Sequence, residues 1–308
     1  MSHSPQFHVR PALPDELVAA FTLIFRRFPE DERTPRTLRA LRLVSDGELP
    51  AEGVRVVAGA DGLLGALVCV ALPGASGLVW PPQTADDTCR EAVEDALLRD
   101  GLGWLRSCGV KLLQTLLLPA ETCSAAPLER NGFRHVTGLL YMRHLLNART
   151  KAALPEGPPL SYRTYAEPDC ADFHDALMRS YEDTLDCPEL NGVRSVEEII
   201  AGHKTQGAYD PERWWLALLD GRPVAVVLLN EQPELDAWDL GYLGVVPEAR
   251  GKGVGRALTI RAIHAARAAG AAELTLAVDV RNLPAHNLYT RLGFQTFDRR
   301  EVYLAFLQ

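Results

Sequence analysis

The chain has 308 residues, of which 23% are charged, and its formal net charge is −8. This length favours two domains of about 150 residues each. The acidic balance argues against a nucleic-acid partner, because surfaces that bind nucleic acid are normally basic. We find no secretion signal and no apolar run long enough to span a bilayer, so we expect a cytoplasmic protein with no membrane partner. The six cysteines form no Cys-x-x-Cys pair and have no histidine at metal-ligand spacing, which favours free thiols and no metal.

The predicted elements occur in the same order in the two halves of the chain. Each half has a strand-like run, an Asp-Gly turn and a second strand-like run, at 55–59 and 63–71 and again at 213–219 and 223–230. The stretch 148–159 contains three prolines and few apolar residues, which is typical of a linker. We therefore expect one domain over residues 1–147 and a second over 160–308.

A shift of 161 residues places nine identical residues between Val93 and Phe133 in one ungapped register. Two of these matches join glycines that follow predicted helices, Gly109 with Gly270 and Gly132 with Gly293. Such a register predicts a tandem repeat of one domain. The alternative is a pair of unrelated segments that share an α/β pattern.

Residues 160–308 show a mixed pattern of helices and strands. Apolar residues recur at helical spacing in some segments and alternate in others. Helices are expected at about 168–180, 195–204 and 254–269, and a further short helix is expected with Pro284 near its first turn and Gly293 just past its end. Strands are expected at 213–219, 223–230, 236–246, 273–280, 294–297 and 302–307. This order predicts a mixed α/β domain (α+β) and excludes an all-parallel, doubly wound sheet.

The sequence Arg-Gly-Lys-Gly-Val-Gly at 250–255 lies between a predicted strand and a predicted helix. The first backbone N–H groups of a helix have no intrahelical partner and favour an anion. Lys252, with Arg250 and Arg256 on either side, adds positive charge, and the glycines let the backbone approach a diphosphate closely. The spacing fits neither a Walker phosphate loop nor a dinucleotide fingerprint. The loop therefore predicts a pyrophosphate site of another kind.

A second motif follows in the segment 279–294, which includes Asn282, Asn287, Tyr289 and Gly293-Phe294. Together with Arg250-x-x-Gly253-x-Gly255, it resembles the GNAT superfamily of acyl-CoA-dependent N-acyltransferases. The resemblance covers about 160–308, and the two motifs stand in the usual order and separation. It implies acetyl-CoA as a co-substrate and an amine as the acceptor.

The resemblance also implies which residues bind the cofactor. The backbone of the preceding strand, broken by a bulge that Gly244 suits, would pair with the pantetheine arm at Leu243 and Val245. The Leu243 amide would also polarise the thioester carbonyl, and Asn282, with Asn287 as an addition, would contact the arm. The loop amides that would hold the pyrophosphate are those of Arg250, Gly251, Lys252, Gly253, Val254, Gly255 and Arg256.

Two residues are expected to carry the chemistry. Asp239 stands on the same predicted strand, where some family members have a glutamate that accepts the proton of the amine, directly or through water. The alternative is a solvated acid at a strand edge. Tyr289 stands where the family has the tyrosine that assists the departing thiolate, and its phenol is protonated at neutral pH. The acidic run 182–189 is either a solvated loop or an attractant for a cationic amine.

The first half of the chain has lost these features. Opposite the loop 250–255 it has Cys89–Glu94, without glycine and with two carboxylates. Leu128 stands opposite Tyr289, and Glu121 stands opposite Asn282. We therefore expect a degenerate copy that keeps the fold, braces the catalytic domain and could wall part of its acceptor site. The tandem layout is similar to that of the mycothiol synthases, which acetylate a cysteinyl amine.

The sequence thus predicts an acetyl-CoA-dependent N-acetyltransferase in which a primary amine attacks directly in a ternary complex. No motif position supplies a nucleophile for a covalent intermediate. Small-molecule amines, aminoglycosides, peptide N-termini and cysteinyl sugars all stay open as acceptors, as does the preferred acyl chain. A non-catalytic CoA-binding sensor or scaffold is the alternative from another class. The sequence gives no indication of the oligomeric state.

Overall fold

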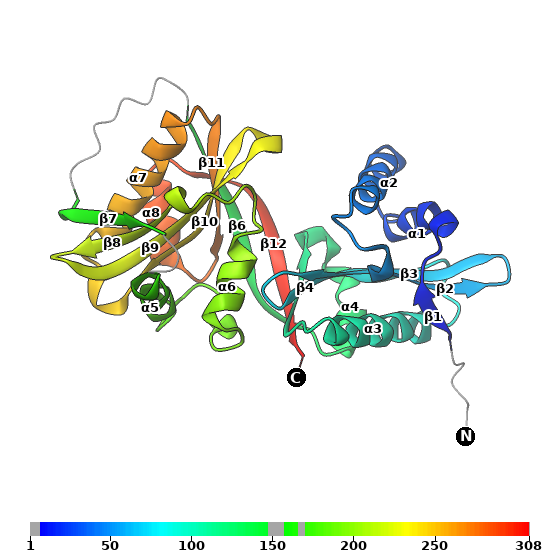
Figure 1. Ribbon diagram of the computed structural model, residues 1–308. Helices are drawn as coiled ribbons and strands as arrows, with labels where there is room; N and C mark the ends of the chain where they lie inside the picture. Colours follow the sequence, from blue (N-terminus) through cyan, green and yellow to red (C-terminus); the bar gives the residue numbers. More distant parts are fainter. Residues whose placement is uncertain (1–6, 147–156, 166–169, 308) are drawn as a thin grey trace. The chain divides into compact units, whose positions relative to one another are not determined.

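The computed structural model describes residues 7–146, 157–165 and 170–307 (Figure 1). The chain forms two compact units, one of Met1–His135 with Glu301–Gln308 and the other of Val136–Arg300. Most of the predicted linker 148–159 lies outside the described residues. Among the described residues, no helix is both long and apolar enough to cross a membrane.

The first unit is a mixed sheet with helices on both faces. Its strands follow the order β1-β2-β3-β4-β5-β12, where β12 (Gln295–Phe306) contributes its last residues, and among the described strands only β4 and β5 pair in parallel. Helices α1 and α2 cover one face and α3 and α4 the other, because alternate residues of β2 and β3 belong to two different core clusters. The elements are β1 (Val9–Pro11), α1 (Leu17–Ile24), α2 (Glu30–Ser45), β2 (Val54–Gly59), β3 (Gly62–Leu72), β4 (Ser76–Thr84), α3 (Arg90–Ser107), β5 (Leu112–Leu117) and α4 (Ala126–Arg130).

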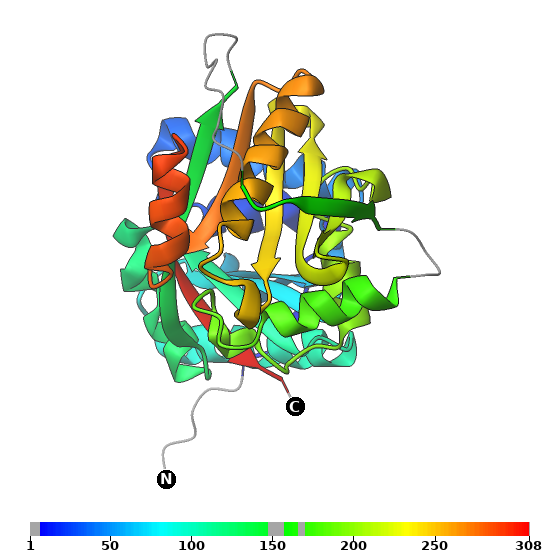
Figure 2. The ribbon, with the colours of Figure 1, turned by 90° about the vertical axis from the view of Figure 1, so that its left-hand side faces the viewer.

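The second unit has the same architecture. Its strands follow the order β6-β11-β10-β9-β8-β7, with β10 and β11 as the parallel pair. Helices α7 and α8 cover one face (Figure 2), and α5 and α6 pack on the other. The elements are β6 (Arg134–Leu145), β7 (Leu160–Thr164), α5 (Ala171–Ser180), α6 (Val196–His203), β8 (Trp214–Leu219), β9 (Arg222–Gln232), β10 (Ala237–Val245), α7 (Val254–Ala268), β11 (Glu273–Asp279), α8 (Leu283–Arg291) and β12 (Gln295–Phe306).

The two units confirm the predicted repeat. Strands β4 and β10 both begin and end 161 residues apart, and so do β6 and β12. In each copy the parallel pair makes only three pairings, and those pairings are also offset by 161 residues. The identities found in the sequence therefore mark equivalent positions of one fold.

The last strand of each copy completes the sheet of the other unit. Residues Leu139–Leu145 of β6 pair with β11 in the second unit. Residues Glu301–Phe306 of β12 pair with β5 in the first unit. The compact units therefore differ from the expected division at residues 147 and 160, because a boundary drawn along the sequence cannot show where a strand pairs.

Two further details of the prediction need correction. The segments 294–297 and 302–307 were expected as separate strands, but β12 runs continuously from Gln295 to Phe306. The charged residues between them stay in the strand through pairing, Asp298 with Arg300 at 2.7 Å and Glu301 with His135 at 2.7 Å. Helices α1 and α2 were not identified in the sequence at all.

Candidate functional site

Strands β10 and β11 separate after a short parallel pairing. They pair from Ala237 to Asp239, whereas β10 pairs with β9 as far as Val245. The N–H of Val246 donates to the Val224 carbonyl of β9 at 3.0 Å. Because backbone groups alternate along a strand, those of Leu243 and Val245 point away from β9, toward the side where β11 diverges. This arrangement suits the predicted pairing of these two residues with an extended ligand.

The bulge in β10 lies at Gly241 and not at Gly244. The register with β9 shifts between Leu240 and Tyr242, whereas Gly244 pairs regularly with Val226. Gly244 serves another purpose, since a Cβ there would lie 2.2 Å from the Ser180 Oγ of α5. The glycine at 244 was thus correctly singled out, but it permits a close helix contact and does not form the bulge.

The glycine-rich loop opens α7 without covering its first amides. Gly251 and Gly253 have φ angles of 73° and 82°, a region that favours glycine, and Gly253 caps the helix with no side-chain hydrogen bond. A Cβ at Gly255 would meet only ordinary contacts, at 3.6 Å from Leu288 and 3.8 Å from Val245. The packing of the protein itself therefore does not require a glycine at 255. A ligand that approaches the backbone there would explain the absence of a side chain. Lys252 is exposed on the loop.

Arg250 braces the loop and does not add its charge to the anion site. Its guanidinium turns toward the end of α5 and to β10, where carbonyl oxygens accept its hydrogen bonds. The acceptors are Val245 at 3.0 Å, Ser180 at 3.1 Å, Glu182 at 2.6 Å and Asp183 at 3.2 Å. The expectation that this side chain supplies charge beside a diphosphate is corrected accordingly, and only its amide stays a candidate ligand.

Tyr289 is buried on α8, with 8% of its surface exposed. Its ring packs against Phe294 at a centroid distance of 5.6 Å. Burial raises the pKa of the phenol, and the nearby carboxyl of Asp186 raises it further. The hydroxyl therefore stays protonated and can donate a hydrogen bond at any physiological pH.

Asp186 is the residue of this region that the sequence did not single out. Its Oδ2 accepts a hydrogen bond from the Asn282 amide at 3.4 Å, and burial raises its pKa to about 6. Asn282 also caps α8, because its Oδ1 accepts the Ala285 N–H at 3.2 Å. The only signal in the sequence was the acidic run 182–189. Asn287, the other predicted arm contact, lies exposed on α8.

The Asp239 carboxyl lies at the last paired position before β10 and β11 diverge. Its Oδ1 accepts a hydrogen bond from the Thr275 hydroxyl at 2.8 Å. Burial raises its pKa, and the hydrogen bond from Thr275 partly opposes that shift. A raised pKa makes a carboxylate a stronger base, which suits it to accept a proton from an amine. The alternative of a fully solvated edge acid does not fit this burial.

A group of possible metal ligands lies beside the site, formed by Asp186, Cys187 and Asp279 with ligand atoms within 4.8 Å of one another. Asp279 already accepts hydrogen bonds from Thr137 at 2.6 Å and from the Cys187 N–H at 3.0 Å, and it forms an ion pair with Arg281 at 2.7 Å. Although burial acts to raise it, these partners hold its pKa at about 2. The group is therefore organised as a hydrogen-bonded network that fixes the loop before α8.

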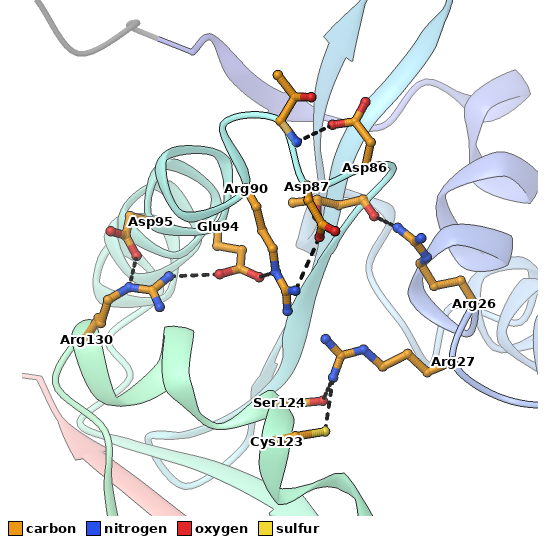
Figure 3. Close-up of polar contacts among 12 residues, drawn as sticks. Arg26, Arg27, Asp86, Asp87, Arg90, Glu94, Asp95, Cys123, Ser124 and Arg130 are labelled. Carbon is orange, nitrogen blue, oxygen red and sulfur yellow. Dashed lines mark hydrogen bonds and ion pairs between the residues drawn. The ribbon is translucent and has the colours of Figure 1, made fainter.

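In the first unit, side chains replace the loop (Figure 3). Helix α3 begins at Arg90, the position equivalent to Gly251, so a helical turn stands where the second unit has its glycines. Glu94, equivalent to Gly255, is 2% exposed. Its carboxylate accepts from Arg90 at 2.9 Å and from Arg130 at 2.8 Å. A carboxylate of the protein itself thus occupies the position equivalent to the predicted anion site of the second unit.

Comparison with known proteins agrees with this geometry. Residues 172–294 match the acetyltransferase (GNAT) family model. The chain is 30% identical over 278 residues to the mycothiol acetyltransferase of Gordonia bronchialis, and the match covers 82% of this chain and 87% of that one. The chain belongs to the GNAT family of acetyltransferases. Matches to the mycothiol acetyltransferases of Thermomonospora curvata and Nocardia farcinica, both 32% identical, cover 58% and 54% of those proteins.

Solved structures of this family share the fold of the whole chain. A GCN5-related N-acetyltransferase from Sphaerobacter thermophilus superposes with a TM-score of 0.63 at 18% identity, over 97% of this chain and 95% of that one. A tandem GNAT protein from the clavulanic acid biosynthesis pathway gives a TM-score of 0.51 at 16% identity over 98% of both chains. The protein is thus a GNAT acetyltransferase with a tandem fold, and its family implies acetyl-CoA as co-substrate. The roles of individual site residues stay predictions.

Proposed function

We propose that the second unit transfers the acetyl group of acetyl-CoA to a primary amine. The observation that carries this proposal is the separation of β10 and β11 next to a helix opened by glycines. Amides from Gly251 to Arg256 would bind the pyrophosphate. Backbone groups of Leu243 and the Val245 N–H would bind the pantetheine arm, since the Val245 carbonyl already accepts a hydrogen bond from Arg250. Bound acetyl-CoA supplies an acyl carbon activated as a thioester.

Two side chains would move the protons of the reaction. Asp239, directly or through water, accepts a proton from the attacking amine as the C–N bond forms. The Leu243 N–H stabilises negative charge on the acyl oxygen. Tyr289 donates its proton to the sulfur as the C–S bond breaks and regains one from solvent. The products are the amide and free CoA, and no covalent link to the protein forms.

The experiment measures CoA thiol release with a panel of primary amines, for wild type and Tyr289→Phe. We expect kcat to fall about 100-fold in the variant, within the range for loss of a general acid. Acetyl-CoA affinity, measured by calorimetry, should stay within about twofold. A non-catalytic sensor predicts the opposite result, namely tight binding of acetyl-CoA, no turnover of any amine and no effect of Tyr289→Phe.

For the acceptor, we propose a cysteinyl amine carried on a sugar, as in mycothiol synthesis. The support is the 30% identity to a protein named mycothiol acetyltransferase across 87% of its length. The test compares kcat/KM for cysteinyl-glucosamine with the values for lysine, a peptide N-terminus and an aminoglycoside. We expect the cysteinyl acceptor to be favoured at least tenfold. Equal or lower kcat/KM for cysteinyl-glucosamine would remove this acceptor and leave the acetyltransferase proposal standing.

A further inference from the structure

Strand β6 places Tyr141 on the same sheet face as Asp239. In the second unit, Tyr141 pairs with Ala277 of β11, and Asp239 pairs with Thr275 of the same strand. Paired residues on neighbouring strands, and residues two apart along one strand, share a face. Asp239, Thr275, Ala277 and Tyr141 therefore face the same way. Tyr141 belongs to the first half of the sequence, so no motif of the second half could have indicated it.

This face is open above the middle strand. Strand β11 lies between β10 and β6, where side chains are normally covered, yet Ala277 is exposed. Neighbouring strands lie about 4.8 Å apart and a strand rises about 3.3 Å per residue. Tyr141 lies two strands from Asp239 and is displaced by two residues along β11, so their backbones lie about 12 Å apart. A small amine fits in that width, with the methyl group of Ala277 beneath it. The position also borders the place where β10 and β11 diverge.

The surroundings of Tyr141 are aromatic and charged. Its ring lies 6.4 Å from that of Phe297 in an edge-to-face arrangement, and Phe297 is 49% exposed. The Arg143 guanidinium lies 5.4 Å above the Phe297 ring. Burial raises the pKa of the Tyr141 phenol. The charge of Arg300 opposes this shift in part, and the charges of Asp298 and Asp239 add to it. The hydroxyl therefore stays a neutral donor and acceptor, near enough to Asp239 to feel its charge.

We propose that Tyr141 is a positioning residue of the acceptor site and hydrogen-bonds a polar group of the acceptor while its amine faces Asp239. The inference rests on the proposed acetyl transfer and adds to it a specificity residue from the exchanged strand. Tyr141 touches neither the thioester nor the proton path. Its hydroxyl fixes the acceptor across β11, and Ala277 keeps the space between the two side chains clear.

The first test removes the hydroxyl and keeps the ring, in Tyr141→Phe, with cysteinyl-glucosamine as acceptor. A lost hydrogen bond of this kind should raise the acceptor KM about 3- to 10-fold. We expect kcat and the KM for acetyl-CoA to stay within about twofold. The matched control is Tyr162→Phe. Tyr162 lies on β7 and packs under the guanidinium of Arg261. The kcat and both KM values of this variant should match those of wild type.

The second test introduces a large side chain between Asp239 and Tyr141 with Ala277→Leu, and Ala277→Ser, which keeps the side chain small, is its control. The Leu variant should raise the acceptor KM more than tenfold with an unchanged Kd for acetyl-CoA, and the Ser variant should behave as wild type. An unchanged acceptor KM in both Tyr141→Phe and Ala277→Leu would overturn the inference.

The inference and the proposed function fail in different ways. If wild type acetylates no amine, the proposed function fails, and the inference is then decided by binding. Calorimetric titration of CoA-saturated protein with cysteinyl-glucosamine should give a 3- to 10-fold weaker Kd for Tyr141→Phe than for wild type. Equal affinities, or no binding to wild type, would overturn the inference.

Discussion

The helices α7 and α3 hold equivalent positions in the two units, yet their N-termini are opposite in character. α7 starts after Gly251 and Gly253, has Gly255 as its second residue, and is capped by Gly253 with no side-chain hydrogen bond. α3 starts one turn earlier and presents Glu94 between two arginines (Figure 3). In the first unit the Glu94 carboxylate is paired with two arginines. In the second unit we propose that a ligand's anionic group takes the equivalent place. The same fold can thus be kept while the loop before this helix is replaced by a helical turn and a buried carboxylate.

Strands β4 and β10, which precede these helices, also differ in the groups that they could offer to a ligand. Leu243 of β10 has a backbone N–H that points away from β9, and the equivalent residue of β4 is Pro82, which has none. Where β4 and β5 separate in the first unit, Pro82 therefore offers no backbone N–H that could donate a hydrogen bond to an acyl oxygen. This loss concerns a backbone group, and the alignment of β4 with β10 reveals it.

The largest effect is expected when the Glu94 carboxylate is copied into the second unit as Gly255→Glu. Repulsion between a carboxylate and a diphosphate at about 4 Å amounts to roughly 4 kcal/mol, so acetyl-CoA affinity should fall about 1000-fold in calorimetry. Gly103→Glu, which adds the same charge at an open position of α3, is the control and should bind as wild type. Binding by Gly255→Glu within threefold of wild type would show that α7 is not the pyrophosphate site.

A smaller loss is expected when Pro82 is copied as Leu243→Pro. The change removes an N–H that makes no bond to β9, so the strand should persist. Loss of an oxyanion donor lowers kcat about 100-fold or more. Leu243→Ala keeps the N–H and should lower kcat less than about fivefold. A folded Leu243→Pro variant with unchanged kcat would exclude this amide from the reaction.

In the first unit, the internal ion pair should contribute to stability and not to binding. Glu94→Gln removes the charge that Arg90 and Arg130 share, and these arginines are partly exposed, which limits the penalty. We expect about 2 kcal/mol less unfolding free energy in urea denaturation. The control, Glu91→Gln on the exposed side of the same helix, should change it by less than about 0.5 kcal/mol. A weaker acetyl-CoA affinity in Glu94→Gln would mean that the first unit still takes part in binding.

The smallest effect concerns Asp186, whose folded pKa of about 6 lies above that of an unfolded aspartate. A carboxyl with a raised folded pKa adds stability below about pH 4, and this is lost as the pH rises through 6. Asp186→Asn should therefore raise the unfolding free energy by about 1–2 kcal/mol at pH 8 and by little at pH 4. The exposed Glu182→Gln should give no such pH dependence. Equal effects of Asp186→Asn at both pH values would contradict the raised pKa.

Sequence reasoning succeeded where the signal is local. The glycines at 251 and 253 mark a turn with positive φ, and the apolar period of α7 and the alternation of β11 depend on neighbours within a few residues. The repeat was found because both copies keep the same spacing between these local signals. Tyr289 and Asp239 were singled out by resemblance to the GNAT family, and burial raises the pKa of both.

What the sequence did not indicate depends on distant partners. The bulge at Gly241 follows from the register of β10 against β9, and the sequence offered Gly244 as an equally good position. The direction of the Arg250 side chain is set by carbonyls about 70 positions earlier in the chain. Asp186 acquires its environment from α8, and nothing in the acidic run around it distinguishes this carboxyl from its neighbours.

The exchange of β6 and β12 also limits which parts of the chain can be deleted during evolution. A copy without a binding loop is usually free to decay or be deleted, but here its final strand is a structural part of the other copy. A gene shortened to residues 160–308 would leave β11 without its antiparallel neighbour, with an open edge prone to aggregation. The first half therefore has a structural role in the second unit through β6, whether or not it binds a ligand itself.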